Sequence, residues 1–102
     1  MNPAPGFDEL IHPPTRLSIV ALLAAAEWAD FTFVRDNLGL TDSALSKQVS
    51  TLEQAGYVTV RKTGAGRARR THLRLSAAGR RAFRGHAAAL QQIIAEAGTL
   101  AP

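Results

Sequence analysis

The sequence predicts a mainly α-helical domain with one small β-hairpin, an α+β fold in a chain of 102 residues. Three stretches of different pattern predict it. Apolar residues have helical spacing before Gly56, alternate with polar ones over 58–61 and 72–75, and return to helical spacing after Ser76. A chain of this length buries one core of modest size and has no room for a second domain. All elements are therefore expected to share one core.

The N-terminal residues 1–14 are expected to form an extended arm, because they hold four of the five prolines. At most a short turn of helix is expected within them, over 7–11. The first helix follows over 15–28, where TRLSIVALLAAAEW is apolar on nearly every face and so marks the central helix of a small core. Asp30 and Phe31 then form a very short strand.

A pair of closely linked helices is expected next. Thr32 is the predicted N-cap of a second helix over 33–38, which Gly39 ends as a glycine in the left-handed conformation. The third helix, 42–55, follows the predicted N-cap Thr41 and stops at the next glycine. Two helices joined by a three-residue link that contains glycine are typical of a helix-turn-helix.

The third helix has two contrasting faces. At about 100° per residue, Leu45, Val49 and Leu52 fall close together and form a core stripe. The opposite face carries hydroxyls, an amide and one cation but no acid, on Ser43, Lys47, Ser50 and Gln54, with Ser46 and Thr51 at its flanks. A face that served only solubility would more often carry paired Glu and Lys. These side chains instead suit contacts with base edges and phosphates.

The alternating segment predicts two antiparallel strands, in which Val58 and Val60 share a buried face with Leu73 and Leu75. The connection TGAGRARR, 63–70, is too long for a two-residue turn and carries glycines that let it swing outward. Helix, short strand, helix, turn, helix and hairpin is the order of a winged helix-turn-helix. The sequence therefore predicts a winged helix-turn-helix DNA-binding domain over 15–76, whose basic hairpin loop is the wing.

Charge is strongly one-sided along the chain. Residues 1–46 hold two arginines and six acids, a net charge of −4, whereas residues 47–102 hold ten cations and two acids, a net charge of +8. No acid lies between Gln54 and Ala95. This distribution indicates a polyanionic partner, with nucleic acid ahead of a membrane surface because no long amphipathic basic helix carries the charge. A solvated basic surface is the alternative interpretation.

The closing helix, 77–97, is expected to begin after Ser76 as its cap. An apolar stripe runs nearly its whole length, through Phe83, Ala87, Leu90, Ile94 and Ala97. One small domain has little surface left to cover this stripe, so we expect dimerisation with a second copy. The alternative is that the helix folds back on its own domain. A twofold dimer would bind a pseudo-palindromic operator on double-stranded DNA.

Two segments resemble a known family. LTDSALSKQVSTLEQAGYVTVRK and GRARRTHLRLSAAGRRAF are similar to the winged-helix repressors of the MarR type, above all to short stand-alone members with little beyond the DNA-binding domain. The likeness covers roughly residues 8–95. It implies a homodimeric transcriptional regulator in which the helix matching 42–55 reads the major groove and the wing matching 63–70 contacts the backbone or minor groove. Terminal helices pair the two subunits in this family.

One departure from the family concerns small-molecule effectors. Full-length MarR-type proteins have an additional N-terminal helix and a longer C-terminal region, between which ligands often bind. This chain has a proline-rich start and a single closing helix, so the sequence leaves open whether an effector binds. Repression by blocking polymerase is the simplest mechanism for a domain with no room for an activation surface.

The candidate DNA-binding residues combine the exposed side of the third helix with the wing. They are Thr41, Ser43, Ala44, Ser46, Lys47, Gln48, Ser50, Thr51, Lys62, Arg67, Arg69 and Arg70. Wing arginines are suited to a neighbouring backbone or a narrow minor groove. A second set, Arg80, Arg81 and Arg84, is interpreted as a solvated helix face, with DNA contact as the alternative.

Other chemistries have little support in the sequence. The chain has no cysteine, which excludes disulfides and thiol catalysis. His12, His72 and His86 have no metal-ligand spacing, and Ser76 has no base nearby in sequence, so no metal, no cofactor and no catalytic residue is expected. No signal peptide or membrane span is recognised, and a soluble, cytoplasmic protein is expected. The alternative function is a winged-helix protein-interaction module with an acidic partner.

Overall fold

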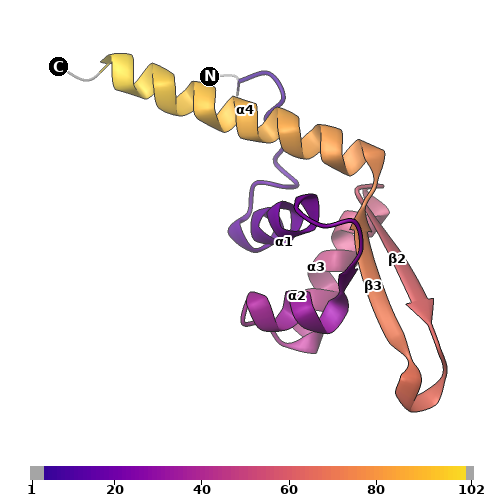
Figure 1. Cartoon of the computed structure of the whole chain (residues 1–102). Helices are drawn as coiled ribbons and strands as arrows, with labels where there is room; N and C mark the ends of the chain where they lie inside the picture. Colours follow the sequence, from indigo (N-terminus) through magenta and orange to yellow (C-terminus); the bar gives the residue numbers. More distant parts are fainter. Residues whose placement is uncertain (1–3, 101–102) are drawn as a thin grey trace.

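The computed structural model describes residues 4–100, and within them three helices pack on one side of a small sheet and a fourth leads away from the end of its last strand (Figure 1). The elements in chain order are α1 Pro14–Ala24, β1 Ala29–Asp30, α2 Phe31–Asn37, α3 Asp42–Gln54, β2 Val58–Thr63, a short 3-10 turn Gly66–Ala68, β3 Arg70–Leu75 and α4 Ala77–Leu100. The expected class, mainly helical with a small β-hairpin and an additional C-terminal helix, is confirmed.

The sheet is antiparallel, with the strand order β1-β3-β2. In the hairpin, Val58 pairs with Leu75 and Val60 pairs with Leu73, so these four side chains share the face that points into the domain. Val58, Leu73 and Leu75 are buried, which confirms the predicted alternation. The loop of the hairpin extends beyond the helices α1–α3 at one end of the molecule, and α4 extends from the opposite end (Figure 1).

The core lies between the helices α1–α3 and the inner face of the sheet. Its fully or almost fully buried members include Ile19, Val20, Leu23, Val34, Leu45, Val49, Leu52, Leu73 and Leu75. The predicted core stripe of α3 is thus confirmed. Since α3 and the hairpin meet in the same core, the position of the wing relative to the outer side of α3 is fixed by packing.

Two predicted caps have different outcomes. Thr41 is the N-cap of α3, because the backbone N–H of Ala44 donates to its hydroxyl oxygen over 3.1 Å. The prediction for Thr32 was wrong: α2 begins at Phe31, two residues before the predicted start, and its N-cap Asp30 makes no side-chain capping bond. The strand β1 runs directly into α2 there, so backbone pairing with β3 sets the start of the helix.

The first helix is shorter than predicted, since α1 ends at Ala24 rather than at Trp28. A side chain far along the sequence explains this end: Arg80 of α4 donates to the carbonyl oxygens of Ala24 and Ala26 over 3.2 and 3.0 Å. These carbonyls, which a helix end leaves without partners, are satisfied by tertiary contact. The apolar residues that follow therefore form a loop toward β1.

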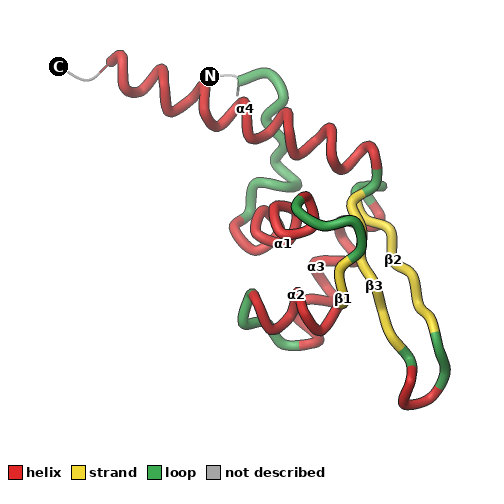
Figure 2. The backbone as a smooth tube through the Cα atoms, in the orientation of Figure 1, coloured by secondary structure: helices red, strands yellow, loops and turns green. Residues whose placement is uncertain are grey.

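Turns at 5–6 and 9–11 interrupt the extended arm that was predicted over 1–14, and the second turn lies within the range 7–11 where one was expected. Residues 1–3 of the predicted arm lie outside the described residues. The backbone N–H groups of Phe7 and His12 donate to the carbonyls of Ala4 and Asp8, both over 3.0 Å. Ile11 is fully buried in the core. Residues 4–13 have no helix or strand and pass from α4 to α1 (Figure 2), which ties the start of the chain to its last helix.

The helix α4 is in contact with the domain over its first half only. His86 and Ala89 are fully buried, and the predicted dimerisation residues Phe83, Ala87 and Leu90 are half-buried. From Gln91 to Thr99 every residue is exposed, including the predicted dimerisation residues Ile94 and Ala97. The alternative interpretation, in which the helix folds back on its own domain, therefore applies to the first half, while the second half projects away from the body (Figure 2).

Candidate nucleic-acid interface

A groove of about 440 Å³ separates the outer side of α3 from the wing. It is lined from α2, α3 and both strands of the hairpin by Phe31, Thr32, Arg35, Asp42, Ser46, Val49, Ser50, Glu53, Val60, Lys62, Thr71 and Leu73. Val49, Val60 and Leu73 form the apolar floor, because they belong to the inner face of the sheet and the core stripe of α3. We call this concavity the α3–wing groove.

The candidate residues of α3 divide into an exposed and a half-buried set. Ser43, Ser46, Lys47 and Ser50 are exposed, whereas Ala44, Gln48 and Thr51 are half-buried. Only Ser46 and Ser50 line the α3–wing groove. At 100° per residue Ala44 and Gln48 lie on the flank away from that groove, toward α1.

Two threonine hydroxyls of the candidate set already serve the backbone. The hydroxyl of Thr41 accepts the N–H of Ala44, and the hydroxyl of Thr51 donates to the carbonyl of Lys47 over 3.2 Å. The hydroxyl proton of Thr41 can therefore still be donated to a ligand, whereas that of Thr51 is already donated within the helix.

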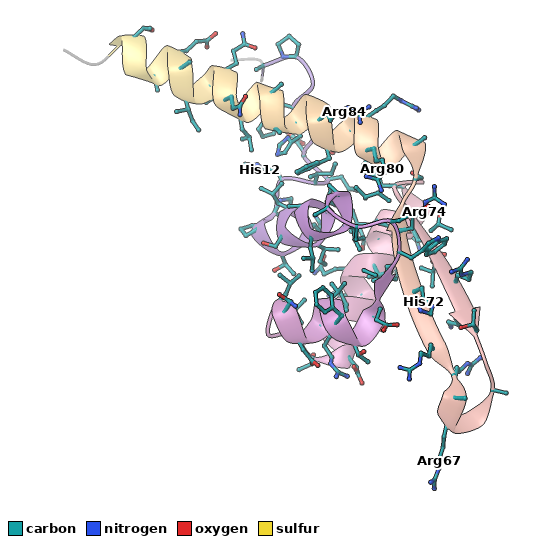
Figure 3. The ribbon with its side chains drawn as sticks, in the orientation of Figure 1. His12, Arg67, His72, Arg74, Arg80 and Arg84 are labelled. Carbon is teal, nitrogen blue, oxygen red and sulfur yellow. The ribbon has the colours of Figure 1, made fainter. Side chains whose placement is uncertain are left out.

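The wing spreads its arginines instead of gathering them. Arg67 lies in the 3-10 turn at the tip and points into solvent (Figure 3). Arg69 and Arg70 line a smaller depression of about 130 Å³ beside β1 and the start of α2. Lys62 is exposed and borders the α3–wing groove. Gly64 closes the loop with φ +76°, where a Cβ would lie 2.2 Å from the carbonyl oxygen of Ala68.

The groove contains acids that the helical projection had not placed there. The sequence indicated an acid-free outer face, yet Asp42 and Glu53 line the groove beside Ser46 and Ser50. They lie on the flank of α3 that faces the wing, about 100° around the helix from the centre of the face that the projection described. The acid-free description therefore applies to the outermost face and is wrong for the groove.

Arg35 is a groove residue that the sequence had not singled out. Its guanidinium donates to Asp36 over 2.8 Å and to Asp42 over 2.7 Å, which links the end of α2 to the first turn of α3. These bonds raise the pKa of Arg35 and hold the pKa of the Asp36 carboxyl below its usual value. The sequence did hold a signal for this ion pair, because Arg35 comes shortly before the turn and Asp42 lies in the first turn of the next helix.

Arg16 is a second residue that the sequence had not singled out. It extends from α1 to the recognition-helix candidate Gln48, whose side-chain oxygen accepts from Arg16 Nη1 over 3.0 Å. The Nε of Arg16 donates to the carbonyl of Leu10. The bond to Gln48 joins residues 32 positions apart, so no local pattern reveals it.

The outer face of the hairpin is also basic, on the side opposite the groove. By register, Arg61 pairs with His72 and Arg74 pairs with Thr59 on this face. The guanidinium of Arg61 lies 4.1 Å, and that of Arg74 5.5 Å, from the ring centre of Trp28. Such cation–π stacking holds the two arginines in place.

The arginines at the start of α4 have different roles. Arg80 is half-buried and bonded to the end of α1, so it is a structural residue. Arg81 and Arg84 are exposed, and Arg84 points away from the body (Figure 3). The interpretation of all three as a solvated face was wrong for Arg80.

Two of the three histidines, which the sequence separates widely, lie together. The Nδ1 of His86 accepts from the backbone N–H of Asp8 over 2.9 Å, and its Nε2 lies 3.2 Å from Nδ1 of His12. Since Nδ1 accepts, the neutral ring carries its proton on Nε2 and donates it to His12. Burial lowers the pKa of His86, with His12 adding to the effect. A neutral ring so protonated has no free nitrogen for a metal.

Within residues 4–100 no group of three or more His, Cys, Asp or Glu residues is placed to hold a metal ion. No helix in that range has the length and apolar character needed to cross a bilayer.

Comparisons with known proteins agree with this geometry. A family model described as a winged helix DNA-binding domain matches residues 15–94. An uncharacterized protein of Methanocaldococcus jannaschii is 28% identical over 78 residues, which cover 76% of this chain and 85% of that protein. The matched range of the family model includes the helices α1–α3, the wing and most of α4.

Solved structures share the fold. A transcriptional regulator homologue from Pyrococcus horikoshii has a TM-score of 0.81 at 26% identity, covering 87% of this chain and 88% of that one. The YusO protein of Bacillus subtilis has a TM-score of 0.79 at 18% identity, covering 92% and 66%. The PcaV transcriptional regulator of Streptomyces coelicolor, solved with its natural ligand, has a TM-score of 0.72 at 25% identity, covering 93% and 67%. The chain belongs to the winged helix DNA-binding domain family, and its structural neighbours are MarR-family transcriptional regulators.

Proposed function

We propose that this chain is a sequence-specific regulator that binds double-stranded DNA with α3 in the major groove and the wing on the adjacent backbone or minor groove. One observation carries the proposal: exposed polar residues of α3 and a cation of the wing strand border the same groove. Ser46 and Ser50 lie on one side of it and Lys62 on the other. A duplex that accepts α3 would therefore meet the wing at the same time.

Charge supports a phosphate-rich partner for this side. Lys47 is exposed on the outermost face of α3, Lys62 borders the groove from the wing strand, and Arg67 extends the positive charge to the tip of the wing (Figure 3). Each phosphate that such a side chain neutralises releases counterions, which favours binding. The carboxylates of Asp42 and Glu53 repel phosphate but can accept from the amino group of cytosine. Their presence in the groove favours base contacts over a purely non-specific role.

We propose further that two copies pair through α4. The supporting observation is the exposed second half of this helix, where Ile93 is 39% and Ile94 is 69% exposed. An apolar face of this kind, left open on a terminal helix, is suited to an identical copy. Two copies would place their α3 helices about one turn of DNA apart, on a pseudo-palindromic operator. Repression by exclusion of polymerase from that operator is the simplest mechanism.

The experiment is selection of duplex fragments by the purified chain at roughly physiological salt. The proposal expects enrichment of a sequence with inverted half-sites. Recovery of fragments without any shared sequence, at an affinity no greater than that for bulk DNA, would contradict specific binding. A gel shift with the selected site and with a scrambled site of equal composition provides the control.

A second candidate function is supported by the outer face of the hairpin. Arg61 and Arg74 are stacked on Trp28 there, facing away from the α3–wing groove. An acidic protein partner could bind this face, and the chain would then act as an interaction module. Loss of a captured acidic protein on Arg61→Ala, with DNA selection unchanged, would distinguish this function from the first.

A further inference from the structure

The contact between Arg16 and Gln48 determines which way the Gln48 amide points. A guanidinium carries only donors, so the atom that faces it at 3.0 Å has to be the amide oxygen. The amide nitrogen then points away from α1. Arg16 itself is held by a second bond, from its Nε to the carbonyl of Leu10, and the neighbouring Ile11 is fully buried. The orientation is thus fixed by packed structure.

The amide nitrogen of Gln48 is available for a ligand. Within residues 4–100 it has no hydrogen-bond partner, and it is not among the buried polar atoms left without one. Gln48 lies on α3 at the flank beside α1, next along the helix to the exposed Lys47. The two N–H groups therefore remain open to whatever lies against this flank of the helix.

This orientation changes what Gln48 can recognise. A glutamine reads adenine with both ends of its amide, because the oxygen accepts from the adenine amino group while the nitrogen donates to N7. With its oxygen turned toward Arg16, Gln48 cannot present both ends of its amide to one base, and the end that points away from α1 carries the donors. A donor alone can bond guanine O6 or N7, adenine N7, thymine O4 or a phosphate oxygen, so it gives no preference for adenine.

We propose that Arg16 is a positioning residue that turns the oxygen of Gln48 toward α1, so that Gln48 meets DNA with its donors and α3 does not favour adenine through both ends of this amide. The proposal rests on the proposed function, because it concerns the same DNA contact. It assigns roles that the sequence did not reveal, since Arg16 belongs to another helix and is 32 positions from Gln48.

Three variants separate the acceptor from the donors. Gln48→Glu keeps an oxygen for Arg16 and removes both N–H donors, while Gln48→Met removes donors and acceptor without adding charge. Arg16→Met frees the Gln48 oxygen. Gln91→Glu, at an exposed position of α4, is the control for the added negative charge. For each variant, duplex selection gives a base profile and direct titration gives an affinity.

Loss of the donors is expected to weaken binding about tenfold in both Gln48 variants, as for one hydrogen bond to a charged or polar acceptor. If the acceptor is a base, guanine or thymine preference disappears at one position of each half-site; if it is phosphate, the loss is uniform over sequences. Arg16→Met is expected to raise the preference for adenine at that position, because both ends of the Gln48 amide become free, a change that a merely structural role would not produce. A wild-type preference for adenine that depends on Gln48, or unchanged binding by both Gln48 variants, would overturn the proposal.

A measurement without DNA separates this proposal from the proposed function. Arg16→Met should shift the side-chain amide resonances of Gln48 in the free protein, whereas Gln91→Glu should leave them unchanged. If the Gln48 amide resonances are unchanged by Arg16→Met, the positioning role of Arg16 is overturned, even if DNA binding is specific. A shift as expected, together with no selected sequence at all, would overturn the DNA-binding function, and with it the DNA contact that this proposal gives to Gln48.

Discussion

His86 of α4 accepts a hydrogen bond from the backbone N–H of Asp8, a residue 78 positions away, over 2.9 Å. The ring is fully buried, and Tyr57 donates to the carboxylate of the same Asp8 over 2.6 Å. Ring contacts with Phe7 and His12, at centroid distances of 4.9 Å between those two and 4.7 Å between Phe7 and His86, complete the cluster. The start of the chain, the end of α3 and α4 are thereby held together, which sets the direction of the projecting helix.

This cluster makes stability depend on pH. The pKa of His86 lies below its ordinary value of 6.5, because burial opposes the charged ring. Well above pH 6.5 the His86 ring is neutral in both the folded and the unfolded chain, and its contribution to stability is fully present. As pH falls through 6.5, the ring takes up a proton more readily in the unfolded chain than in the folded one, and this contribution is lost. We expect the free energy of unfolding from urea titrations to decrease between about pH 7.5 and pH 5.

His86→Leu is the matched variant for this prediction. It loses the Asp8 hydrogen bond and is less stable at neutral pH, yet its stability should fall less steeply over the same pH range. His72→Gln, which changes a histidine outside the cluster, should leave the slope due to His86 in place. An equal pH slope in the wild type and in His86→Leu would show that His86 does not cause it.

A glycine in α4 is required by close packing. A Cβ at Gly79 would lie 2.2 Å from the carbonyl oxygen of Tyr57, so Gly79→Ala should lower the free energy of unfolding by about 1–3 kcal/mol. Gly98→Ala is the control in the same helix, where no atom lies within 4 Å. Because alanine forms helices better than glycine and meets no neighbour there, Gly98→Ala should not lower the free energy of unfolding. Equal effects at both positions in urea unfolding would contradict the packing argument.

The exposed half of α4 predicts the oligomeric state. Ile94→Asp places a charge on the apolar face that we propose as the dimer contact, and it should convert the protein to a monomer in light scattering after size exclusion. Ala95→Asp adds the same charge at the next residue, about 100° around the helix, and should leave the dimer largely intact. A wild-type protein that is monomeric at all concentrations would exclude pairing through α4.

The two carboxylates bonded to Arg35 are expected to differ in their effect on DNA binding. Asp42 lines the α3–wing groove and Asp36 does not, although each accepts from the same guanidinium. Asp42→Asn removes a negative charge that faces the duplex, so non-specific binding should tighten about two- to fivefold at low salt. Asp36→Asn should change affinity less, which titration with an unrelated duplex will show.

The periodic elements were predictable from the sequence because their burial patterns are local. The stripe Leu45, Val49 and Leu52 and the alternation around Val58 and Leu75 each follow from one buried face and its period. The N-cap Thr41 was predictable for the same reason, since its partner lies three residues away.

What escaped prediction depends on contacts between distant residues. The end of α1 at Ala24 is set by Arg80, 56 positions away, and His12 meets His86 across 74 positions. A helical projection considers one helix by itself and ignores the elements packed beside it. It therefore could not place Asp42 in a groove whose other wall is the hairpin. The fold was therefore more accessible from the sequence than the polar contacts of the site.

The affinity for a selected duplex as a function of salt concentration tests the central claim most directly, that the α3–wing groove and the wing bind one duplex together. Wild-type protein is compared with Arg67→Ala/Arg69→Ala/Arg70→Ala, whose three changes are all at exposed positions. We expect weaker binding to all sequences and a shallower slope of log affinity against log salt, by about 2–3 if each arginine neutralises one phosphate. An unchanged affinity and an unchanged slope would contradict the account.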